Sequence, residues 1–299
     1  MRESIAQSTN DKNELKNIKV RKFKNSIFHG LLLMTIGFSI LVLGLLLFQI
    51  LSSGLKWLDW DFITSMPSRF PERAGIFSAL VGSIWTIGFT ALFSIPLGVG
   101  TALYLEEYTN SKSWFNKFLQ LNISNLAGVP AIVYGMLGLA VFVRLLNFER
   151  SILAGALTLT LLILPVIIVS SQQAIRNVPD IIAEGSYALG MSRWQTITGV
   201  ILPYAFPGIL TGSILAISRA MGEAAPLIIV GAAGYIAFLP SGPMDSFTVL
   251  PIQIFNWTSR PQADFQNIAS AGIIVLMILL LSMNAVAIYL RNKYQNRID

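Results

Sequence analysis

The sequence contains apolar runs that are long enough to cross a lipid bilayer. A transmembrane helix needs about 20 mostly apolar residues, because the hydrocarbon core is about 30 Å thick. Five runs reach this length directly, and a sixth becomes visible once small and hydroxyl-bearing residues are accepted within it. The predicted spans are residues 28–51, 79–105, 127–146, 152–171, 206–230 and 268–289.

The composition agrees with a chain that lives in a membrane. Hydrophobic residues make up 54% of the sequence and charged residues only 12%, whereas about a quarter of the residues in a soluble domain are charged. Within lipid, a single segment satisfies its own backbone polar groups only as a helix. The predicted fold class is therefore an all-α membrane protein with six transmembrane helices.

Basic residues flank the chain at both ends. Seven lysines and arginines lie between residues 2 and 24, and three more follow Leu290. Because cytoplasmic segments of membrane proteins carry an excess of such residues, both termini are expected in the cytoplasm, which an even number of spans allows. The net charge of +6 comes largely from these flanks, so it indicates topology rather than nucleic-acid binding.

The domain organisation follows from this topology. Residues 1–27 are polar and lack apolar periodicity, so they are predicted to form a disordered cytoplasmic tail. Residues 28–74 are expected to hold the first transmembrane helix and a segment outside the membrane, and residues 75–299 the main transmembrane domain. There are no cysteines and only one histidine, His29, so no metal site is expected.

The stretch 179–203 is too polar to lie in lipid, and it carries helix start signals. Asp180 is a candidate N-cap, and Ser192 with Gln195 has the spacing of a capping box, so two short helices meeting at Gly190 are predicted. Trp194, Ile197 and Ile201 recur at helical spacing and predict one apolar face. This pattern indicates a docking surface in a cytoplasmic loop, residues 176–205; the alternative is an amphipathic connector at the lipid headgroups.

One span contains a charged pair. Arg219 lies thirteen residues into span 206–230, roughly 20 Å along a helix, where a charge costs about 2.5–3.5 kcal/mol. Glu223 follows four residues later and can pair with it. Arg219 is therefore a candidate contact for an anion crossing the membrane, with Glu223 holding or tuning it, and Gly222 and Pro226 would permit local unwinding. The alternative is a purely structural salt bridge.

Glycines and prolines recur in the other spans. Small residues let helices approach closely, and neighbouring helices tolerate a proline kink. This pattern is typical of a tightly packed bundle that changes shape, although both residue types are also simply commoner in membrane helices. The predicted hinge or packing positions outside the charged pair are Pro96, Gly128, Pro130 and Pro165.

Sequence features for nucleotide chemistry are absent. There is no glycine-rich phosphate loop, and no lysine lies between Lys117 and Lys293, so a partner must supply any ATP hydrolysis. No catalytic constellation is recognisable either, and the chain is not expected to be an enzyme. A gradient-driven anion transporter or channel would also account for the charged pair, and a structural or signalling subunit would account for the loop.

The loop resembles the EAA motif of ABC importer permeases, in which Glu-Ala-Ala is followed by glycine and by a terminal Leu-Pro. Glu184, Gly190, Leu202 and Pro203 match this pattern, Val200 stands at the isoleucine position, and Gly185 and Ser186 replace the two alanines. The resemblance implies a coupling helix that sits in a groove of a cytoplasmic ATPase. The two replacements put the stability of this helix in question more than its docking.

Several longer stretches carry a more specific resemblance: PLGVGTALYLEEY, NLAGVPAIVYGMLGLAVFV, LAGALTLTLLILPV, ALGMSRWQTITGVILP and ISRAMGEAAPL. They resemble the PstA-type permeases of phosphate importers. This resemblance implies a MetI-like bundle in the bacterial inner membrane that carries phosphate or a related oxyanion. The implied partners are a PstC-like permease, two ATPase subunits that bind ATP and Mg, and a periplasmic phosphate-binding protein. No cofactor is expected on this chain itself. Ala224 and residues 169–173 depart from the family pattern.

Overall fold

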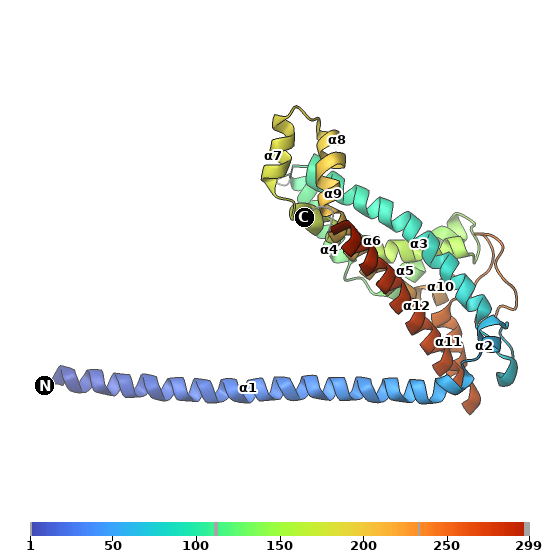
Figure 1. The fold of residues 1–299 in the computed structure, drawn as a ribbon, viewed down its shortest axis with the longest axis horizontal. Coiled ribbons are helices and arrows are strands. Elements are labelled where there is room, and N and C mark those ends of the chain that lie inside the picture. The colour runs from blue at the N-terminus through green and yellow to red at the C-terminus, as the bar shows by residue number, and fades with distance from the viewer. Residues whose placement is uncertain (1, 111–112, 233, 296–299) are drawn as a thin grey trace. The chain divides into compact units, whose positions relative to one another are not determined.

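The computed structural model describes residues 2–110, 113–232 and 234–295. The chain divides into two compact units, Met1–Ser52 and Ser53–Asp299. The first unit holds nearly all of the long helix α1 (Arg2–Gly54; Figure 1). The apolar side chains of α1 from Phe28 onward are largely exposed, as expected of a helix that faces lipid. The helix continues through the basic tail, where the sequence predicts disorder. Residues 2–28 contain neither glycine nor proline, so no helix breaker separates the tail from the first span.

The second unit is helical throughout its described residues, apart from loops and an isolated β-bridge between Ser151 and Ser246. Its α-helices are α2 (Trp60–Thr64), α3 (Phe77–Leu103), α4 (Trp114–Leu126), α5 (Ala131–Gly138), α6 (Ile152–Arg176), α7 (Asp180–Ala188), α8 (Arg193–Thr196), α9 (Leu202–Gly222), α10 (Ala225–Val230), α11 (Leu250–Thr258) and α12 (Ala263–Gln295). Short 3₁₀ turns are η1 (Leu55–Trp57) and η2 (Pro71–Arg73), and π-helical turns are η3 (Tyr104–Tyr108), η4 (Leu139–Leu145) and η5 (Ile197–Ile201).

Five helical segments of the described chain are long and apolar enough to span a membrane, and the number rises to six if α4 and α5–η4 are counted as one broken span. The two parts of that broken span meet at an angle of 103°. The predicted span 127–146 begins at this break, where Gly128 and Pro130 lie, and its helical part is α5–η4. The predicted span 206–230 is also divided, into α9 and α10.

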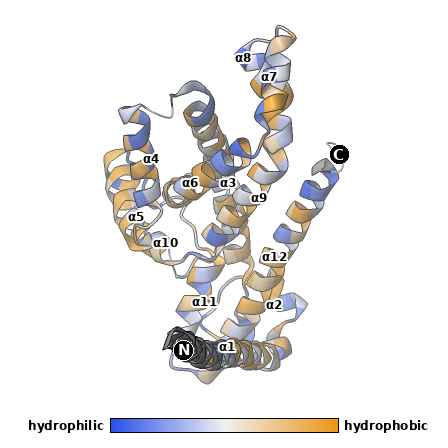
Figure 2. Ribbon diagram, turned by 90° about the vertical axis from the view of Figure 1, so that its left-hand side faces the viewer, coloured by the Kyte–Doolittle hydropathy of each residue, from blue (hydrophilic) through white to orange (hydrophobic). Residues whose placement is uncertain are grey.

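Helix α6 forms the centre of the second unit, where it packs against α3 and α9. Small residues bring these helices together: a Cβ atom on Gly98 of α3 would lie 2.5 Å from Cγ2 of Ile167 on α6, and one on Gly208 of α9 would lie 2.7 Å from Cβ of Ala174. Helix packing in membranes favours such close approach. Figure 2 shows hydrophobic residues along much of α5 and α12, with hydrophilic residues near the C-terminal end of α12.

The segment before α3 belongs to the second unit. Phe62 and Ala74 are buried in a cluster with Trp257, Phe265 and Ile268. The compact unit therefore begins at Ser53, whereas the sequence places the boundary at residue 75. In Figure 1, α2 and α11 lie at one end of this unit and α7 and α8 project from the other.

A loop between α10 and α11 closes the start of α6. The first amides of α6 need partners outside the helix: Ile152 N–H donates to the carbonyl of Asp245 (3.1 Å) and Leu153 N–H to that of Pro243 (2.9 Å). Ser151 caps the helix by accepting from Ala154 N–H (3.2 Å). This end of the bundle is thus held together by main-chain hydrogen bonds.

Candidate coupling loop and anion pathway

Two short helices, α7 and α8, form the loop, as the sequence predicts. They meet at Gly190, whose φ of +82° lies in the left-handed region that glycine adopts without strain. The capping box is also confirmed: Ser192 accepts from Gln195 N–H (3.4 Å), and the Gln195 side chain accepts from Ser192 N–H (2.8 Å). Asp180 is not the N-cap, because Pro179 occupies that position and Asp180 is the first helical residue. There its carboxylate faces the positive end of the helix dipole.

The apolar side chains of the loop divide into exposed and buried groups. Leu189 is 85% exposed and Trp194 64% exposed, whereas Ile197 is only 1% exposed. Ile201 is 3% exposed, so the predicted apolar face is buried at Ile197 and Ile201 and exposed only at Trp194. Exposed Leu189 and Trp194 leave apolar surface available for a partner.

The residues that match the EAA motif occupy different environments. Glu184 and Gly185 are exposed on α7, and a Cβ atom on Gly185 would meet open space. Ser186 is buried: its hydroxyl donates to the carbonyl of Ala183 (2.7 Å) and shares a hydrogen bond with Thr196 Oγ1 (2.9 Å). The serine that replaces alanine thus links α7 to α8. At the end of the motif, Val200 and Leu202 are half-buried and Pro203 is exposed.

An ion pair ties the base of this loop to α3. Glu106 Oε1 accepts from Arg176 Nη2 (2.7 Å) and from Gln172 Nε2 (2.7 Å), and Glu106 Oε2 accepts from Arg176 Nε (2.9 Å). The Glu106 side chain is only 15% exposed. The partners of Glu106 lie 66 and 70 residues away, so no local sequence pattern reveals this ion pair.

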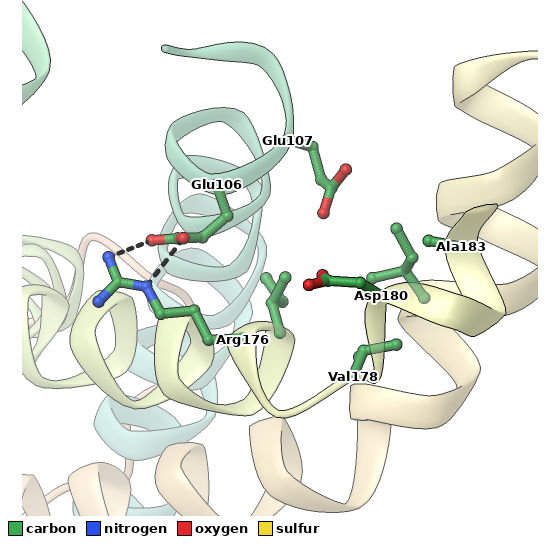
Figure 3. A pocket seen from close by; sticks show the side chains of 8 residues that line it. Glu106, Glu107, Arg176, Val178, Asp180 and Ala183 are labelled. Carbon is green, nitrogen blue, oxygen red and sulfur yellow. Dashed lines mark hydrogen bonds and ion pairs between the residues drawn. The ribbon is translucent and has the colours of Figure 1, made fainter. Parts of the chain in front are cut away.

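A cavity of about 230 Å³ lies beside this ion pair. Glu107 and Asp180 project into it (Figure 3). The guanidinium of Arg193 on α8 lies over the ring of Tyr108, 5.0 Å from its centre, a cation–π arrangement. The inner end of α3 is therefore in contact with both the base and the second helix of the loop.

The charged pair lies at a helix break. Arg219 Nε is 3.6 Å from Glu223 Oε1, and the two side chains are 49% and 24% exposed. Helix α9 ends at Gly222, Glu223 has an extended conformation (φ −84°, ψ 114°), and α10 begins at Ala225 with Pro226 in its first turn. The two residues pair although they do not share one continuous helix. The interruption occurs where the sequence predicts local unwinding.

The other predicted hinge and packing positions behave differently from one another. Pro96 and Pro165 lie inside α3 and α6, which continue through them. Pro130 is the N-cap of α5, directly at the 103° break. A residue that the sequence did not single out spans this break, since the Tyr134 hydroxyl donates to the Leu126 carbonyl (2.8 Å).

Helix α9 connects the loop to the charged pair. It begins at Leu202, inside the EAA-like motif, and reaches Arg219 seventeen residues later, which corresponds to roughly 26 Å at 1.5 Å per residue. The end of the EAA-like motif and Arg219 therefore lie on one continuous helix.

Sequence comparisons identify the relatives of this chain. The family described as "Binding-protein-dependent transport system inner membrane component" matches residues 94–296. The chain is 36% identical over 253 residues to the probable ABC transporter permease protein YqgI of Bacillus subtilis, covering 81% of this chain and 86% of that protein. It is 31% identical over 285 residues to the phosphate transport system permease protein PstA 1 of Mycobacterium tuberculosis (strain CDC 1551 / Oshkosh), covering 91% and 90%, respectively.

Solved structures share the fold. A bacterial alginate ABC transporter, in complex with an alginate-bound periplasmic protein, gives a TM-score of 0.65 at 18% identity over 88% of this chain and 93% of the matched chain. The inward-facing methionine transporter MetNI gives 0.54 at 16% identity over 74% and 94%. The MetI-like permease fold predicted from the sequence is thus confirmed. The chain belongs to the family of binding-protein-dependent transport system inner membrane components, as a multi-pass permease of the inner membrane.

Proposed function

We propose that this chain is a permease subunit of an ATP-driven importer that moves inorganic phosphate across the bacterial inner membrane. The observation that supports phosphate as the substrate is the similarity to phosphate transport permeases, at 31% and 32% identity over 91% and 92% of this chain. The helix break beside Arg219 supports it, because an exposed guanidinium within a span is a suitable contact for an anion.

The chain works with separate partners in this proposal. A periplasmic phosphate-binding protein delivers the anion to a pair of permeases, this chain and a PstC-like subunit. Two cytoplasmic ATPase subunits bind ATP and Mg and hydrolyse the nucleotide. The permease binds no cofactor, and its own part is to open a path on alternate sides of the membrane.

The α7–α8 loop receives the movement of the ATPases. Exposed Glu184 and Leu189 contact the ATPase surface, and Gly190 permits the sharp turn between the two helices. Leu202 and Pro203 begin α9, so motion of the loop shifts α9 and the charged pair at its far end. Phosphate passes Arg219, whose charge Glu223 partly offsets.

Uptake by the reconstituted importer tests this function. In proteoliposomes that contain this chain, its co-purifying permease and the ATPase subunits, phosphate enters only when ATP and the binding protein are supplied. Uptake without ATP or ATPase subunits would instead identify a gradient-driven transporter or channel. Equal competition by another oxyanion, such as sulfate, would contradict phosphate as the substrate.

A further inference from the structure

The side of α9 that carries Arg219 continues toward the end of the helix next to the coupling loop. Thr211, Leu215 and Arg219 follow one another at four-residue steps, so they lie along one side of the helix. Leu215 and Arg219 are exposed, and Thr211 is half-buried. An anion released from Arg219 toward the cytoplasm would therefore move along this row.

A cavity opens on this row between α9 and α12. Its volume is about 240 Å³, enough for several water molecules at about 30 Å³ each. It is lined by Thr211, Ile214, Leu215, Asn284, Ala287, Ile288 and Arg291. None of these seven residues is a carboxylate, and Arg291 is the one cation among them.

The polar groups of the cavity can donate hydrogen bonds to an oxyanion. The Ser218 hydroxyl donates to Asn284 Oδ1 at 2.6 Å, and the Asn284 NH₂ group has no hydrogen-bond partner among the described residues, so it can donate to a ligand. Within the same part of the chain, Arg291 approaches only Asn292 Oδ1, from Nε and Nη2 at 3.3 Å each. Its other guanidinium N–H groups remain free for a ligand within the described part of the chain.

Arg291 and Arg219 differ in their surroundings. Glu223 lies 3.6 Å from Arg219 and offsets its charge, whereas no described carboxylate pairs with Arg291. Asn284 contacts Ser218, the residue before Arg219, and Arg291 follows Asn284 by seven residues on α12, or about 10 Å. Several weak binding sites that follow one another along a pathway allow an ion both to bind and to move out of the pathway.

We propose that the α9–α12 cavity is a second anion site on the cytoplasmic side of Arg219. Inorganic phosphate binds there to the Arg291 guanidinium and the Asn284 amide, and Ser218 positions that amide. The inference rests on the proposed import function, because it assigns the next contact of the same transported anion. A phosphate group could also come from the headgroup of an anionic lipid, since basic residues at the inner membrane surface attract such lipids.

The neighbouring lysine provides a matched control for the uptake experiment. Lys293 is exposed, does not line the cavity, and lies two residues after Arg291, so Arg291→Gln and Lys293→Gln remove the same charge from the same helix end. We expect Arg291→Gln to lower ATP-driven phosphate uptake by at least about tenfold, because it removes charge-assisted hydrogen bonds. Lys293→Gln stays within about twofold, and Arg291→Lys recovers part of the loss.

A binding measurement separates this site from the import function. The chain has no cysteine, so Leu215→Cys introduces a single thiol at the cavity. In the assembled importer without ATP, inorganic phosphate should slow modification of this thiol by a methanethiosulfonate reagent. In the double variant with Leu215→Cys, Arg291→Gln should abolish this protection, whereas Lys293→Gln should leave it intact.

The outcomes distinguish the two proposals. Protection that depends on Arg291 without ATP-driven uptake supports the site and contradicts the import function. ATP-driven uptake without protection overturns the site and leaves the import function standing. Equal uptake by the Arg291 and Lys293 variants also overturns the site. A defect of Arg291→Gln that disappears in liposomes without anionic lipid assigns the cavity to a headgroup and overturns phosphate passage through it.

Discussion

Arg176 and Glu106 form a two-point ion pair, with Nη2–Oε1 and Nε–Oε2 distances of 2.7 and 2.9 Å. Arg176 is the last residue of α6, and the coupling helix α7 begins four residues later at Asp180. Glu106 lies in the π-helical turn that ends α3. The pair therefore fixes the base of the loop to a second membrane helix, as the proposed role of the loop in coupling requires.

Neutralising Glu106 should weaken both the fold and the coupling. We expect Glu106→Gln to lower the free energy of unfolding by about 1 kcal/mol, less than the usual contribution of charged hydrogen bonds, because Arg176 is half exposed. Thermal unfolding in detergent measures this, and the ratio of phosphate imported to ATP hydrolysed should also fall. Glu107→Gln is the control, since no ion pair of Glu107 is found among the described residues. The charge exchange Glu106→Arg with Arg176→Glu should restore part of the lost stability. Equal effects of Glu106→Gln and Glu107→Gln would contradict a role of the Glu106–Arg176 ion pair.

Reversing the charge of Glu184 should uncouple transport from ATP hydrolysis. Glu184 is exposed on α7, so Glu184→Lys should remove its proposed contact with the ATPase without disturbing the packing of the bundle. We expect normal membrane insertion, loss of most phosphate uptake and reduced co-purification of the ATPase, with a smaller effect for Glu184→Gln. Unchanged ATPase assembly and uptake in Glu184→Lys would exclude this contact.

Removing the charge of Arg219 should stop phosphate passage. Arg219→Gln leaves the α7–α8 loop intact, so the ATPases should still bind and hydrolyse ATP while uptake falls to background. Arg219→Lys keeps the charge but not the planar donor group, and should retain part of the uptake. If Arg219→Gln transports phosphate normally, the pair with Glu223 has only a structural role.

Restoring the two alanines of the EAA motif should have opposite effects at adjacent positions. Gly185 has open space around it within α7, so Gly185→Ala should stabilise the loop by about 0.5–1 kcal/mol through the helix preference of alanine. Ser186→Ala removes the buried hydrogen bond to Thr196 and should destabilise it by about 1 kcal/mol. Hydrogen exchange of α7 measures both changes. The same direction at both positions would refute this account of the loop.

Glycines of the broken span should differ in their tolerance of a methyl group. A Cβ atom on Gly138 would overlap Thr158 Oγ1 and lie 2.8 Å from its Cγ2, whereas the nearest atom to a Cβ on Gly128 is Asn125 O at 3.5 Å. Gly138→Ala should therefore destabilise the importer by about 1–3 kcal/mol, and Gly128→Ala should change it little. The melting temperature and the folded yield of each variant measure this difference.

Local patterns predicted much of the coupling loop. The turn at Gly190 and the Ser192–Gln195 capping box rest on neighbouring residues, so sequence reasoning found them. The sequence did not reveal that Ile197 is buried while Trp194 is exposed, because Ile197 packs against residues elsewhere in the chain, such as Ile175. The hydrogen bond from Ser186 to Thr196 was also missed, since it depends on how two helices fold onto each other.

The sequence by itself determined that the chain is a helical membrane protein, where its hydrophobic spans lie, and which charged residues fall within them. These properties follow from segment length, apolar composition and residue spacing, which all act locally. Only the tertiary structure decided that Glu106 binds Arg176, that the third span bends by 103°, and that Asn284 and Arg291 share a cavity with the α9 row of Arg219. The ion pair and the cavity bring together residues that are far apart in the chain, and only helix packing places such residues side by side.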